Sequence, residues 1–88
     1  MSGKKQARLV ERGRNECNGG IYEIWDIGDG RGIYVDFNPS LCETMAFPRY
    51  DSRWGRVKSW SKLGVWHEDA TGGKAVRELG YEPVEDER

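Results

Sequence analysis

The clearest pattern in the chain is a pair of runs rich in β-branched and aromatic residues, on either side of a glycine-rich turn. The runs cover residues 21–27 and 32–37, and Asp29-Gly30 lies between them. An Asp-Gly pair in this position favours a two-residue hairpin turn, because such a turn needs positive φ at both central residues. The sequence therefore predicts a β-hairpin over residues 19–37 that turns at Asp29-Gly30.

The position of the turn also predicts how the two strands pair. The expected partners are Ile24 with Val35, Tyr22 with Phe37 and Asp26 with Ile33 on a nearly continuous apolar face, and Trp25 with Tyr34 and Glu23 with Asp36 on the other face. Two carboxylates directly opposite each other are destabilising, so Glu23 and Asp36 need a cation nearby. An Arg from a neighbouring strand or loop is the favoured interpretation, with a metal ion or an acid–base pair as the alternatives.

Weaker signals on either side of the hairpin predict the remaining strands. Residues 7–12 fit a strand or a short helix, and residues 41–47 fit a strand that Pro48 ends. Residues 56–63 alternate as a strand does, although Trp54, Val57 and Trp60 also fit one face of a helix. We favour the strand, with residues 64–66 extending the sheet.

The best helix signal lies near the C-terminus. Thr71 can serve as the N-cap, residues 74–79 are mostly good helix formers, and Gly80 stands where a left-handed C′ residue belongs. Val76 and Tyr81 hold the two positions that touch in a Schellman cap. The elements together predict an α+β fold: a small antiparallel sheet of about four or five strands, a meander with a central hairpin, and one short C-terminal helix.

Length and composition narrow the classes of protein. The 88 residues predict one domain over 1–88, with polar tails at 1–6 and 84–88. Neither an apolar run of membrane-spanning length nor a secretory signal is present, so we expect a cytoplasmic protein that binds no membrane. Cys17 and Cys42 are too few for a disulfide framework, and the single His67 has no partner set for zinc. We therefore expect free thiols, no metal site and no cofactor.

Charge alternates in blocks along a chain whose net charge is −1. Residues 1–14 and 48–62 are basic, whereas 15–47 and 63–88 are acidic. The second basic block also interleaves cations with aromatic rings, a combination that suits interface hot spots and stacking on bases. The candidate binding residues are Arg49, Tyr50, Arg53, Trp54, Arg56, Lys58, Trp60 and Lys62. The alternative is that Trp54 and Trp60 are buried and the cations pair with acidic groups of the same chain.

The motif Gly20-Ile21-Tyr22, followed by Tyr34-Val35, resembles the paired motifs of the GIY-YIG nucleases. That family presents tyrosines from two strands beside a helix-borne Arg and a metal-binding Glu, and Arg49 and Glu78 are the candidates for these roles. The match covers the hairpin and departs from the family at Asp36, which stands in place of the Gly of the second motif. The resemblance implies an active nuclease or a degenerate relative of one.

A second resemblance covers about half of the chain. Residues 42–47, the segment from Gly55 to Leu63 and residues 74–80 resemble small uncharacterised proteins of bacteriophages and prophages. Those proteins share a Glu-Thr-Met-x-Phe strand and a Val-x-x-Trp segment. The resemblance implies a small accessory protein that acts by binding a component of the host cell.

These observations favour a non-enzymatic accessory protein that binds a host macromolecule through the basic and aromatic block. A protein is the favoured partner. A nucleic-acid-binding module is the first alternative, and a GIY-YIG-like nuclease is the second. The oligomeric state is left open by the sequence.

Overall fold

The structure is a computed structural model that describes residues 5–28, 30–50 and 62–85, with the backbone alone at 49 and 50. Its elements are the strands β1 (Lys5–Asn15), β2 (Gly20–Gly28), β3 (Arg31–Asn38), β4 (Glu43–Tyr50), β5 (Gly64–Trp66) and β6 (Tyr81–Val84), and the helix α1 (Lys74–Glu78).

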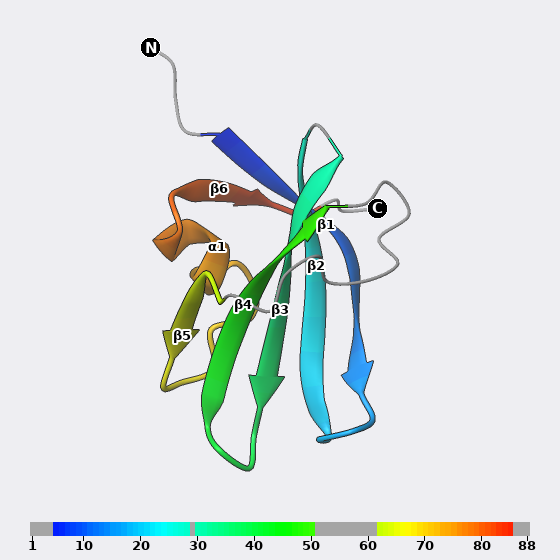
Figure 1. The fold of residues 1–88 in the computed structure, drawn as a ribbon, viewed down its shortest axis with the longest axis vertical. Coiled ribbons are helices and arrows are strands. Elements are labelled where there is room, and N and C mark those ends of the chain that lie inside the picture. The colour runs from blue at the N-terminus through cyan, green and yellow to red at the C-terminus, as the bar shows by residue number, and fades with distance from the viewer. Residues whose placement is uncertain (1–4, 29, 51–61, 86–88) are drawn as a thin grey trace.

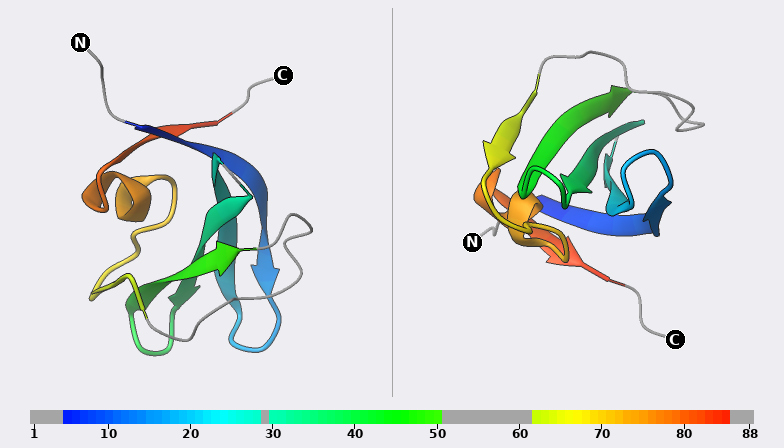
Figure 2. Two further views of the ribbon diagram at one scale, coloured as in Figure 1. Left: turned by 45° about the horizontal axis from the view of Figure 1, so that its top comes forward. Right: turned by 90° about the horizontal axis from the view of Figure 1, so that it is seen from below.

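The six strands form one sheet in the order β5-β4-β3-β2-β1-β6. Neighbours from β5 to β1 are antiparallel, whereas β1 and β6 are parallel. The sheet curls into an incomplete barrel, and α1 lies at its open side between β5 and β6 (Figures 1 and 2). The expected α+β fold with four or five strands is therefore wrong, because the described residues are mostly strand, in six strands, and the described helix has five residues. Local sequence signals missed β6, which exists through its pairing with the distant β1.

Strand β1 bends along its length, and its two parts pair with different strands. It is 11 residues long, and its first half lies beside β6 while its second half lies beside β2. The register against β2 shifts between Leu9 and Glu11, and a bulge of this kind bends a strand and increases its twist. The undecided segment 7–12 is thus strand. Lys5 and Gln6, which were predicted to lie in a polar tail, belong to this strand.

The predicted hairpin exists and turns where expected, but its register is wrong by one residue. Gly28 pairs with Arg31 across the turn, and beyond a bulge between Asp26 and Gly28 the pairs become Trp25 with Ile33 and Glu23 with Val35. Gly28 has φ +96°, a conformation that glycine adopts without the strain of a side chain. The bulge therefore places Trp25, predicted on the opposite face, beside Ile33. It also separates the carboxylates of Glu23 and Asp36.

Strand β4 continues through Pro48, where the sequence predicted that it would stop. The described part of β5 pairs with Thr44, Met45 and Ala46, so Pro48 lies beyond that stretch of β4. Among the described residues, no strand pairs with Pro48 on the β5 side, and proline is tolerated where its missing N–H is not part of a ladder. The strand predicted over residues 41–47 is thus confirmed as a strand with shifted ends, and β5 confirms the predicted extension of the sheet at residues 64–66.

Trp25 is the largest side chain of the core, and it is 0% exposed. The buried cluster comes from the inner face of the curled sheet, the segment before α1 and the facing side of α1, and consists of Ala7, Trp25, Ile33, Val35, Ala46, Ala70, Ala75 and Val76. The predicted apolar face of Tyr22, Ile24 and Phe37 is wrong as the main core, because the bulge reverses the inward and outward positions of β2 relative to β3.

Helix α1 begins later than predicted and ends as predicted. Gly73 is the N-cap without a side-chain cap bond, and the N–H and hydroxyl of Thr71 donate instead to the carboxylate of Asp69. At the other end Gly80 has φ +100°, and its N–H donates to the carbonyl of Arg77 over 3.0 Å. That bond is one of the two in a Schellman cap. No helix in the described part of the chain is long and apolar enough to cross a bilayer.

Candidate functional site

A buried glutamate holds together four parts of the molecule. Glu23, on the inner face of β2, is 1% exposed. One carboxylate oxygen accepts the indole N–H of Trp25 over 3.0 Å, and the other accepts the backbone N–H of Gly72 over 2.7 Å and Nε of Arg12 over 3.0 Å. Arg12 in turn donates to Glu85, which follows β6, over 3.1 Å. The carboxylate therefore links β1 and β2 to the segment before α1, and through Arg12 to the end of β6.

The acidic partners of Arg12 favour its charged form. Partial burial lowers the pKa of Arg12, but hydrogen bonds and attraction from Glu85 and Glu23 outweigh it and raise the pKa above its ordinary value. The predicted cation for Glu23 is thus an Arg from the neighbouring strand, as favoured from the sequence. Asp36 has a different partner, because its carboxylate accepts the side-chain N–H of Asn15 over 3.0 Å.

Thr44 makes a second anchor between the sheet and the segment before α1. It is 0% exposed on the inner face of β4. Its hydroxyl donates to the carbonyl of Glu68 over 2.6 Å and accepts the N–H of Ala70 over 2.9 Å. Residues 68–72 are therefore fixed to the inner face at two points, and they determine where α1 and the start of β6 lie.

A pocket of about 270 Å³ lies at the end of the sheet that carries the β2–β3 turn. Most of its walls are apolar, and these side chains are Ile27, Ile33, Pro48, Leu63, Leu79 and Tyr81. They come from β2, β3, β4, the residue before β5, the end of α1 and β6. The pocket therefore forms only when the curled sheet and α1 are assembled. We call it the Arg31 pocket, after the charged residue in its lining.

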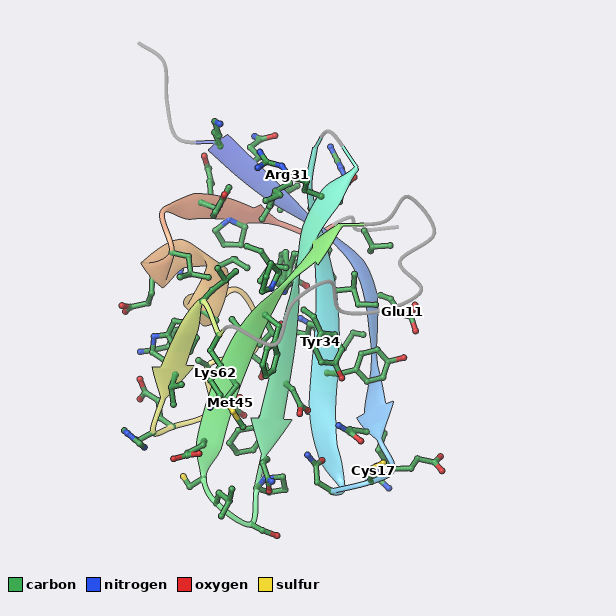
Figure 3. The ribbon with its side chains drawn as sticks, viewed as in Figure 1. Glu11, Cys17, Arg31, Tyr34, Met45 and Lys62 are labelled. Atoms are coloured by element: carbon green, nitrogen blue, oxygen red, sulfur yellow. The ribbon has the colours of Figure 1, made fainter. Side chains whose placement is uncertain are left out.

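Arg31 is the one charged residue among the described residues that line the pocket. It opens β3 beside Gly32, which also lines the pocket, and its side chain is exposed. Figure 3 shows it at the end of the sheet opposite Cys17. Within residues 5–28, 30–50 and 62–85 the structure gives Arg31 neither an ion pair nor a side-chain hydrogen bond. Among the described residues, the Arg31 side chain thus has no ion-pair or hydrogen-bond partner, and it lines a cavity whose other side chains are mostly apolar.

Three of the predicted binding residues are neighbours of residues that line this pocket, in the β3–β4 ladder or along the chain. Arg49 lies opposite Gly32 and Tyr50 lies opposite Arg31 in the β3–β4 ladder. Lys62 is exposed and directly precedes Leu63, a wall of the pocket. The other predicted residues, Arg53, Trp54, Arg56, Lys58 and Trp60, lie outside the described residues, as does the predicted strand up to residue 61. Lys62 and Leu63 precede β5 and are not part of a strand.

Arg31 was not among the binding residues predicted from the sequence, where it formed part of the turn. Its neighbours in the pocket, Leu79 and Tyr81, are far away in sequence, so no local pattern pointed to the site. The one signal was a cation directly after the Asp29-Gly30 turn, in an otherwise acidic block.

The groups considered for metal binding lie elsewhere. Cys17 and Cys42 are free and exposed, in the turns that follow β1 and β3. His67 is exposed and pairs through Nδ1 with Glu43 over 3.3 Å. Across the described ranges, no group of three or more His, Cys, Asp or Glu residues is arranged to hold a metal ion.

The two tyrosines of the GIY-YIG resemblance lie on the outer face of the sheet. Tyr22 and Tyr34 stack with ring centroids 6.0 Å apart, and Phe47 continues the row at 6.4 Å from Tyr34. The Tyr22 hydroxyl donates a hydrogen bond to Glu11, which raises the pKa of Tyr22. Of the candidate partners, Arg49 is on β4 and Glu78 is the last residue of α1.

Comparisons of the chain with protein-family models, with curated proteins and with solved structures give no significant match.

Proposed function

We propose that this protein is a small binding module that holds a protein partner at the Arg31 pocket. The observation that carries the proposal is Arg31, which lines the pocket beside its apolar walls and has no ion-pair partner among the described residues. Arginine and large apolar groups in a concave site are typical of interface hot spots, where an anchor side chain is buried and a charge fixes its orientation. The expected partner therefore presents an apolar anchor together with a carboxylate.

The basic and aromatic block supports the same assignment. It starts beside the pocket at Arg49 and Tyr50 and ends beside it at Lys62. Positive charge around the pocket speeds encounter with an acidic surface and selects against basic partners. The resemblance to phage accessory proteins adds that the partner is a protein of the host cell.

The proposal is tested by capture experiments with charge-reversal variants. Wild-type protein, Arg31→Glu and Arg14→Glu are immobilised and exposed to bacterial lysate, and bound proteins are identified by mass spectrometry. Arg14 is the matched control, because it is an exposed cation near the end of the sheet that lies away from the pocket. We expect a protein that wild type and Arg14→Glu capture equally and that Arg31→Glu loses, with melting temperatures unchanged.

The same experiment distinguishes the other candidate functions. Nuclease treatment of the lysate could abolish capture, and capture could decline steeply with salt. These results would identify a nucleic acid, and not a protein, as the partner. Capture that Arg31→Glu leaves intact would overturn the pocket as the binding site.

A further inference from the structure

The size of the Arg31 pocket limits what can fill it. Its volume of about 270 Å³ is just below the range of about 300–1,000 Å³ that is typical of small-molecule sites. Such a cavity accepts one side chain of a partner, and a longer peptide segment must lie outside it. The residue that enters has to satisfy both the apolar walls and Arg31.

A residue inside an extended peptide meets this requirement poorly. Successive side chains point to opposite faces, and residues two apart on the same face are separated by about 6.6 Å. An apolar side chain and an acidic side chain from the same segment would therefore reach different places. The C-terminal residue of a chain is different, because its side chain and its carboxylate branch from one Cα atom.

The charge of the pocket agrees with a single terminal carboxylate. Arg31 is the one charged residue in the described lining, so a second carboxylate in the cavity would be left without a cation. An α-carboxyl group has an ordinary pKa of about 3.3–3.7 and is ionised at neutral pH. A guanidinium binds such a group through two parallel hydrogen bonds, which fix direction as well as charge.

We propose that the Arg31 pocket captures the C-terminal residue of a partner protein, with an apolar side chain inside the cavity and the terminal carboxylate on Arg31. This inference rests on the proposed function and names the part of the partner that binds. It predicts that the partner ends in an aliphatic or aromatic residue.

The test uses a library of random octapeptides displayed with free C-termini and the full-length protein as bait. Selected peptides are synthesised with a C-terminal carboxylate and with a C-terminal amide, and dissociation constants are measured by isothermal titration calorimetry. We expect the amide to bind at least about tenfold more weakly, the loss typical of one charge-assisted hydrogen-bond pair. The substitution Arg31→Gln should reduce the affinity of the acid to that of the amide and leave the amide unchanged. Arg14→Gln should change neither.

The possible failures separate the two proposals. Equal binding of acid and amide overturns C-terminal capture, while the proposed function stands if Arg31→Glu still abolishes capture of the cellular partner. Selection of no peptide likewise overturns C-terminal capture. If N-acetylphenylalanine binds as tightly as the selected peptides, the ligand is a small carboxylic acid and the protein terminus is excluded. If wild type and Arg31→Glu also capture the same proteins, both proposals fail.

Discussion

At the scale of single residues, the fold depends on a charged group in a place where charge is costly. Glu23 occupies the inner face of β2 beside Trp25, and an ionised carboxylate is tolerated there only because its oxygens are all bonded. Trp25 is fully buried, so its indole N–H has no access to water if the carboxylate is removed. Arg12, by contrast, keeps a side-chain exposure of 40%. The main cost of losing Glu23 therefore falls on Trp25.

Replacing Glu23 with Ala should lower the free energy of unfolding by about 2–4 kcal/mol, through an unsatisfied indole N–H and a new cavity. Urea denaturation measures this change. Glu43→Ala is the control, because Glu43 pairs only with the exposed His67 among described residues and such pairs contribute about 0–1 kcal/mol. Equal stability of the two variants would mean that the Glu23 network contributes little.

At the scale of elements, one bulge decides which side chains of β2 face the core. Gly28 follows the extra residue Ile27, and the pairing on the two sides of this position differs by one residue. Because side chains alternate between the two faces of a strand, a shift of one residue exchanges the side chains of β2 that point inward with those that point outward. Trp25 and Glu23 consequently point inward with Val35, and Tyr22 points outward with Tyr34.

Gly28→Ala should destabilise the protein by about 1–2 kcal/mol, because a residue with a Cβ is strained in the left-handed region. A Cβ at this position would meet no atom within 4 Å, so the change reports the backbone conformation alone. Gly28→Asn should cost less, since Asn tolerates positive φ better than Ala does. Urea denaturation of the three proteins checks the order. An Ala variant as stable as wild type would contradict the bulge geometry.

At the scale of the whole molecule, the positions of β6 and α1 depend on contacts with segments that are distant in sequence. β6 pairs with the first half of β1, and Glu85 reaches Arg12 across 73 residues of sequence. Gly73, the N-cap of α1, lies so close to β6 that an added Cβ would stand 2.9 Å from Cβ of Pro83. The close packing of α1 against β6 therefore requires glycine at position 73.

Gly73→Ala should destabilise the protein by about 1–3 kcal/mol more than Gly72→Ala, because only the first adds a clash with Pro83 to the cost of positive φ. Both glycines have positive φ, and a Cβ on Gly72 would meet nothing within 4 Å, which makes Gly72→Ala the matched control. Thermal unfolding gives the difference. Amide hydrogen exchange should show β6 opening more often in Gly73→Ala alone, and equal exchange in both variants would argue against this contact.

The candidate site could be predicted from the sequence only in part. The basic and aromatic block stays a prediction. Within it, the backbone of Arg49 and Tyr50 lies opposite the pocket residues Gly32 and Arg31, and Lys62 directly precedes the wall residue Leu63. Arg31 was not among the predicted binding residues, because it lines the pocket together with Leu79 and Tyr81, which are distant in sequence. These residues reach the end of β3 through the anchors of Glu23 and Thr44 to residues 68–72.

The sequence by itself determined the features that depend on a few neighbouring residues. The reversal at Asp29-Gly30 and the left-handed Gly80 at the end of α1 follow from local backbone preferences, which act whatever the rest of the chain does. Tertiary structure alone decided the inward face of the hairpin, the parallel pairing of β1 with β6 and the Arg31 pocket. Those features depend on burial and on contacts between distant segments, whose free energies no local pattern contains.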